Sequence, residues 1–237
     1  MASEKSTKSK EVGAVAKFYL IAYNFLQVLG WCYILFKVVN FYLGNEDKNR
    51  TLWEVVELAV VIFQNAAALE IMHAAVGLVK SNPVLTTFQV LSRVVVVCGV
   101  ILATPRSYAA ASSGLPLALI AWSITEIIRY GYYFANLIKV VPHFLVWLRY
   151  TLFIALYPIG ITGELLCFYA ATQYAHAHKT AWSYVLPNAW NFTLSYHYAL
   201  VSIMLLYIPL FPHLYLHMFS QRRKILGTTE KVSKKVH

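Results

Sequence analysis

Residues 150–164 read YTLFIALYPIGITGE and lie inside an apolar run long enough to cross a lipid bilayer. The stretch also contains residues that a passive lipid anchor does not need: Tyr157, Pro158, Gly160, Gly163 and Glu164. In an α-helix, residues seven apart return to one face, about 10 Å apart along the axis. We therefore expect Tyr157 and Glu164 to face one space as an acid/base pair. We expect Pro158 to bend the helix, and the glycines to admit another backbone or a ligand.

The whole chain is strongly apolar, because hydrophobic residues make up 59% of its 237 positions and charged residues only 13%. Long uncharged runs recur along it, whereas lysines and arginines gather at the ends and in short turns. This composition is typical of a multi-span helical membrane protein and excludes a single soluble domain. The formal net charge of +10 is then a topology signal, so we expect no nucleic-acid partner. The three cysteines fall in apolar segments without paired spacing, which predicts neither disulfides nor a metal site.

The hydrophobic pattern predicts an all-α integral membrane protein, a bundle of six transmembrane helices with both termini in the cytosol. The predicted spans cover residues 18–43, 55–79, 84–104, 115–138, 147–175 and 192–218. The chain thus divides into a disordered cytosolic tail at 1–17, a catalytic membrane domain at 18–219 and a basic cytosolic tail at 220–237.

Charges in the short connections distinguish the two sides of the membrane. Lys80, Lys139 and Arg149 join the lysine-rich termini on one side, and this excess of positive charge marks that side as cytosolic. Two N-glycosylation patterns, at Asn49 and Asn191, then fall on the lumenal side.

Charged side chains also occur inside the predicted spans, at one shared depth. Glu70, Arg93, Arg129 and Tyr157 each lie about 14–15 Å from the cytosolic end of their helix at the rise of an α-helix. An unpaired charge at this depth is costly, so both arginines need anionic partners within the bundle. We expect Glu126 to pair with Arg129, three residues away, and Glu70 to pair with Arg93.

Four segments along the chain occur in a characteristic order. They are WSITEIIRY at 122–130, RY at 149–150, the Tyr-Pro-x-Gly-x-x-Gly-Glu core at 157–164 and LPN at 186–188. In this order the segments resemble the 3-hydroxyacyl-CoA dehydratase family of fatty-acid elongation, also called protein tyrosine phosphatase-like. The resemblance covers all six predicted spans.

The resemblance implies that the protein dehydrates a very-long-chain (3R)-3-hydroxyacyl-CoA to a trans-2-enoyl-CoA, with Tyr157 and Glu164 as the catalytic pair. The supporting or substrate-binding positions that it implies are Glu70, Gln89, Arg93, Glu126, Arg129, Arg149 and Gly160. The chemistry agrees with the residues, because an elimination needs one base and one acid and no metal or cofactor. The residues leave open which of the pair is the base, and they leave open the preferred chain length and the oligomeric state.

The resemblance further implies the membrane of the endoplasmic reticulum as the location. The implied partners are membrane lipid, the condensing enzyme, the 3-ketoacyl-CoA reductase and the enoyl-CoA reductase. Near the C-terminus, Lys234 and Lys235 resemble the dilysine retrieval sequence of membrane proteins in that compartment.

Two other classes of protein stay open alongside the enzyme: a transporter of lipid or a small solute, and a catalytically idle scaffold for elongation enzymes. In a transporter, the buried Glu and Arg side chains would form a translocation site. A phosphatase would need Arg six residues after a Cys, and none of the cysteines has this spacing.

Overall fold

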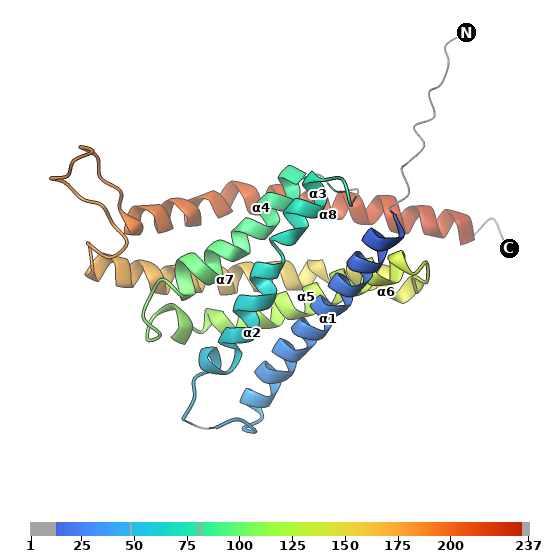
Figure 1. Ribbon diagram of the computed structural model, residues 1–237, viewed down its shortest axis with the longest axis horizontal. Helices are drawn as coiled ribbons and strands as arrows, with labels where there is room; N and C mark the ends of the chain where they lie inside the picture. Colours follow the sequence, from blue (N-terminus) through green and yellow to red (C-terminus); the bar gives the residue numbers. More distant parts are fainter. Residues whose placement is uncertain (1–12, 48, 80, 82, 234–237) are drawn as a thin grey trace, which may run out of the picture.

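The computed structural model describes residues 13–47, 49–79, 81 and 83–233. Within these residues the protein is all-helical and forms no β-strand, as the sequence predicts (Figure 1). Lys80, Lys234 and Lys235 lie outside the described residues, as does the predicted tail up to residue 12.

The helices follow one another along the chain with short connections, except for the long loop 178–195 between α7 and α8. In order they are α1 (Ala14–Tyr42), α2 (Leu52–Ala66), α3 (Leu69–Ala75), α4 (Pro83–Val94), the π-helix η1 (Val95–Ile101), the 3₁₀ turn η2 (Ala109–Ala111), α5 (Gly114–Leu137), α6 (His143–Arg149), α7 (Phe153–Ala177) and α8 (Tyr196–Ser233).

Four helical segments among the described residues are long and apolar enough to cross a membrane: Ala14–Tyr42, Leu52–Ala75, Phe153–Ala177 and Tyr196–Ile225. They correspond to four of the six predicted spans. The predicted third span contains a shorter apolar helix, Thr86–Ile101, and the predicted fourth span is α5, which carries charged side chains.

Several helix boundaries differ from the predicted spans. The first helix already begins at Ala14, so the last residues of the predicted 1–17 tail are helical. The predicted fifth span is broken, because α6 ends at Arg149 and α7 begins at Phe153. The last helix continues to Ser233, well into the predicted basic tail, since charged residues such as Arg and Lys are good helix formers.

The second and third predicted spans are less regular than the pattern suggests. Between α2 and α3 the backbone N–H groups donate to the carbonyl three residues earlier instead of four. The Glu70 N–H, for example, donates to the Ala67 carbonyl at 3.0 Å. After Arg93 the chain widens into η1, where the Leu102 N–H donates to the Val97 carbonyl, five residues back, at 3.0 Å. π-Helical segments inside α-helices are rare and are frequent at functional sites.

The central helix is α5, which packs on α1 on one side and on α7 on the other. Figure 1 shows α7 and α8 side by side, with α1 and α2 crossing them at an angle. Small residues bring α5 and α7 together. A Cβ added to Gly163 would lie 2.5 Å from the Ala118 nitrogen, and one added to Gly114 would lie 2.3 Å from the Gly163 carbonyl oxygen. The predicted close approach at Gly163 is therefore confirmed, with a neighbouring helix as the partner.

Candidate active site

The carboxyl group of Glu164 is buried inside the protein and held from two neighbouring helices. Its side chain is 7% exposed on α7. The Trp122 indole of α5 donates to Oε1 at 2.8 Å, and the Tyr207 hydroxyl of α8 donates to Oε2 at 2.7 Å. Each oxygen thus has one donor, which fixes the orientation of the carboxyl group.

The ring of Tyr157 lies against α8. It stacks on Phe211 with ring centroids 5.4 Å apart and on Tyr215 at 6.0 Å, with the latter two planes only 7° apart. Within the described part of the chain, its hydroxyl donates to no other residue. The ring is therefore fixed by packing, whereas the hydroxyl stays available.

Pro158 removes one backbone hydrogen bond next to Tyr157, and α8 compensates for the loss. Proline has no N–H, so the Ile154 carbonyl four residues earlier lacks its usual helical donor. The Tyr215 hydroxyl donates to this carbonyl at 2.9 Å. Tyr215 thus stabilises the interrupted turn and packs on Tyr157 at the same time.

Tyr157 and Glu164 both contact α8, as their spacing predicts. Their contacts on α8 are one turn apart, at Phe211 and Tyr207. A phenol and a carboxyl group on α7 therefore face the same helix, α8.

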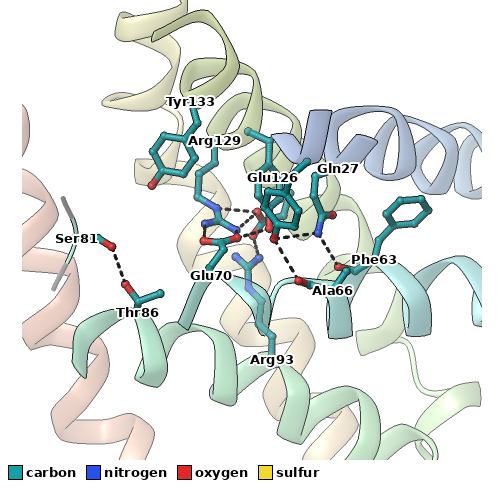
Figure 2. A network of polar contacts seen from close by, with 12 residues as sticks. Gln27, Phe63, Ala66, Glu70, Ser81, Thr86, Arg93, Glu126, Arg129 and Tyr133 are labelled. Atoms are coloured by element: carbon teal, nitrogen blue, oxygen red, sulfur yellow. Dashed lines mark hydrogen bonds and ion pairs between the residues drawn. The ribbon is translucent and has the colours of Figure 1, made fainter. Parts of the chain in front are cut away.

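The predicted layer of charged side chains is a continuous network (Figure 2). Figure 2 shows Glu70 of α3, Arg93 of α4 and Glu126 and Arg129 of α5 pointing toward one another. Arg129 donates to Glu126 at 2.7 Å and to Glu70 at 2.9 Å. Arg93 donates to Glu126, and the Tyr130 hydroxyl donates to Glu70.

The predicted pair of Glu126 and Arg129 is confirmed, but the predicted pair of Glu70 and Arg93 is wrong. Arg93 pairs with Glu126 instead, while Glu70 takes the guanidinium of Arg129. Glu126 thus lies between two arginines. It is only 3% exposed, and a buried carboxylate is destabilising unless cations balance its charge.

The charged network reaches the candidate active site through Trp122. The Arg93 guanidinium carbon lies 5.8 Å from the centroid of the Trp122 ring, and the nitrogen of the same ring donates to Glu164. A change in the ion pairs can therefore move the group that orients Glu164.

Arg149 is held by aromatic rings at the end of α6. Its guanidinium carbon lies 4.5 Å from the ring centroid of Tyr132, 4.7 Å from that of Tyr133 and 5.7 Å from that of Tyr150. It also donates to the Tyr133 hydroxyl at 3.3 Å. The Arg129 guanidinium lies 5.8 Å from the same Tyr133 ring, so Arg149 borders the charged network.

The other predicted positions lie outside this cluster. Gln89 is exposed on α4, and among the described residues no hydrogen bond joins its side chain to the network. Gly160 is buried against α5, where an added Cβ would lie 3.4 Å from that of Ala121. Asn49 and Asn191 are exposed in the α1–α2 and α7–α8 loops, and their glycosylation stays a prediction.

Sequence reasoning missed two groups of the site, Tyr207 and Tyr215. Both lie on one face of α8 with Phe211 between them, at a spacing of four residues. This spacing was the available signal, but it is hard to recognise in a chain with 17 tyrosines.

Comparisons with known proteins agree on one family. The sequence model of the family described as "Protein tyrosine phosphatase-like protein, PTPLA" matches residues 64–228. The chain is 44% identical over 227 residues to the Mus musculus "Very-long-chain (3R)-3-hydroxyacyl-CoA dehydratase 2", covering 96% of this chain and 88% of that protein. It is 46% identical over 214 residues to the Caenorhabditis elegans "Very-long-chain (3R)-3-hydroxyacyl-CoA dehydratase hpo-8", covering 90% and 96%. No solved structure matches the chain.

Proposed function

Because the chain belongs to the protein tyrosine phosphatase-like (PTPLA) family, we propose that it dehydrates very-long-chain (3R)-3-hydroxyacyl-CoA to trans-2-enoyl-CoA. The observation that carries the proposal is the buried carboxyl group of Glu164, held by two donors and facing the same helix as Tyr157. An ionisable group inside a membrane-spanning helix is costly, so its presence indicates a function beyond anchoring or packing.

The reaction is an elimination across the bond between C2 and C3 of the acyl chain. A base takes the proton from C2, the C2–C3 double bond forms, and the C3 hydroxyl leaves as water after an acid protonates it. Tyr157 and Glu164 supply these two groups in our proposal. Negative charge develops toward the thioester oxygen as C2 loses its proton, and we assign its stabilisation to Arg93, which packs on the Trp122 ring that donates to Glu164.

The charged network has a supporting role in this mechanism. Glu70, Glu126 and Arg129 hold Arg93 in place, and Arg93 in turn packs on the indole that orients Glu164. Preorganised charge of this kind needs no rearrangement when the reaction occurs.

The proposed setting is the membrane of the endoplasmic reticulum, with six spans and both termini in the cytosol. In support, the N-terminal end of α1 and the C-terminal end of α8 both lie at the right of Figure 1. The loops that hold Asn49 and Asn191 lie away from that side. α5 can be one of the six spans although it carries charged side chains, because these charges are paired inside the bundle. The condensing enzyme and the two reductases of elongation are the proposed partners.

Product analysis by mass spectrometry tests the function directly. Purified protein in detergent is given 3-hydroxyacyl-CoAs of graded chain length, and loss of one water from the acyl chain is followed over time. Tyr157→Phe and Glu164→Ala should abolish this loss. Tyr169→Phe is the matched control, because Tyr169 is 56% exposed on the same helix. Near-normal turnover by either variant of the pair would overturn the assignment, and solute flux in proteoliposomes without conversion would favour a transporter.

A further inference from the structure

Three buried polar atoms have no hydrogen-bond partner within the part of the chain that the structure describes. Two of them lie at the break between α6 and α7, and the third lies in the C-terminal part of α8. They are Nη1 of Arg149, Oγ1 of Thr151 and Nε of Arg222. Buried polar atoms in folded proteins are nearly always paired, so each exception needs an explanation. Two of these atoms are N–H donors of guanidinium groups, and the third belongs to a hydroxyl that can donate.

The packing of α7 on α8 brings these residues to one end of the helix pair. The Phe153 ring lies 5.2 Å from the ring of Phe219 and 5.9 Å from that of Tyr215, as measured between centroids. Further along, Tyr157 contacts Tyr215 and Phe211, so the two helices run antiparallel. Thr151 lies just before Phe153 in the chain.

The two arginines lie beyond Phe153 and Phe219. Arg222 follows Phe219 by three residues, about one helical turn, and Arg149 ends α6 just before the break that precedes Phe153. Both therefore lie at the α6–α7 end of the antiparallel pair.

Among the described residues, no carboxylate forms a salt bridge with either of these two arginines. In the described part of the chain, every salt bridge of an arginine involves Arg93, Arg106 or Arg129. The tyrosine rings around Arg149 hold its guanidinium without neutralising it.

We propose that Arg149, Thr151 and Arg222 form a phosphate-binding site that takes the phosphate groups of the coenzyme A part of the substrate. Guanidinium groups bind phosphate oxygens through paired, charge-assisted hydrogen bonds. Tyr157 lies four residues beyond Phe153, or about 6 Å further along α7. The extended pantetheine arm then carries the thioester from the phosphates at this end toward Tyr157 and Glu164. The inference rests on the proposed function.

The test compares two thioesters of one 3-hydroxy acid, with coenzyme A and with pantetheine, which lacks the phosphates. In the wild-type protein, kcat/KM should be higher for the coenzyme A thioester. Arg222→Gln should lower the ratio of the two kcat/KM values about tenfold, as expected for the loss of one charge-assisted hydrogen bond. Arg149→Gln should lower the same ratio. Arg223→Gln is the matched control, because Arg223 is the exposed next residue, and its ratio should stay at the wild-type value.

A measurement on the wild-type protein covers the case in which a variant does not fold. Adenosine 3′,5′-bisphosphate should inhibit turnover of the coenzyme A thioester competitively. An unchanged ratio in Arg222→Gln, or no inhibition by this compound, would overturn the phosphate site while leaving the dehydration itself intact. Loss of binding to phosphatidylserine vesicles with an unchanged ratio would instead assign the arginines to a lipid headgroup. Absence of enoyl product from both thioesters would reject the proposed function.

Discussion

Replacing Tyr207 with Phe removes one of the two donors to Glu164 and leaves the rest of the ring in place. The Tyr207 hydroxyl lies 2.7 Å from Oε2 of Glu164, and the Trp122 nitrogen lies 2.8 Å from Oε1. After the change, the carboxyl group keeps its bond to Trp122 but can rotate about it. Tyr207→Phe should therefore impair catalysis while the fold persists.

The size of the effect follows from the kind of bond. A hydrogen bond to a charged group contributes about 1.5–3 kcal/mol, and about 1.4 kcal/mol corresponds to a tenfold change. If the bond orients Glu164 in the transition state, kcat/KM should fall about 10- to 100-fold, mostly through kcat. The Glu164→Ala variant should lose all measurable turnover.

The assay follows enoyl-CoA formation with purified protein, and gel filtration and thermal unfolding serve as checks on the fold. Trp122→Phe should show a loss of similar size, and the double variant should lose less than the product of the two effects, since both donors orient one group. Tyr169→Phe again provides the control. Turnover within about twofold of wild type by correctly folded Tyr207→Phe would refute the argument that this hydroxyl orients Glu164.

Three further changes test the packing and the charges around the site. Gly163→Val places a side chain against the Ala118 backbone and should lower the free energy of unfolding by about 1–3 kcal/mol or more, measured by thermal unfolding. Gly131→Ala, with nothing within 4 Å of the added Cβ, should be at least as stable as wild type, since alanine favours a helix more than glycine does. Glu126→Gln leaves two buried arginines short of a partner and should cost about 3–5 kcal/mol, whereas Glu57→Gln at the exposed Arg106 should cost less than about 1 kcal/mol. Tyr215→Phe leaves the Ile154 carbonyl without its donor, and the Tyr157 ring that stacks on residue 215 should shift. The variant should therefore lower kcat more than it raises KM, and an unchanged kcat would contradict a role of Tyr215 in positioning Tyr157.

The sequence was most informative where a side chain has few acceptable environments. A charged group cannot face lipid, so the depth of Arg93 and Arg129 predicted a buried network with Glu70 and Glu126. The pair of Glu126 and Arg129 followed from their spacing, but the partner of Arg93 did not, since α4 passes into a π-helix directly after Arg93. A periodic pattern assumes a regular helix and contains no signal for this widening.

Contacts between distant helices were the other part that the sequence could not supply. Trp122 and Tyr207 lie 42 and 43 residues from Glu164, and nothing in the spacing of a single helix links them. The break before Phe153 was missed for a related reason. The apolar run continues through residues 150–152, but Arg149 stays with the tyrosines of α5, and the chain must turn before α7 can begin.

The two faces of α7 explain why one short stretch can decide both fold and function. Its small residues face α5, where Gly163 permits backbone contact and holds the helix close to Trp122. Its polar residues, Tyr157 and Glu164, face the tyrosines of α8. A larger residue at position 163 would move α7 away from α5 and would lengthen the bond from Trp122 to Glu164. The packing that stabilises the bundle is therefore the same packing that sets the geometry of the candidate active site.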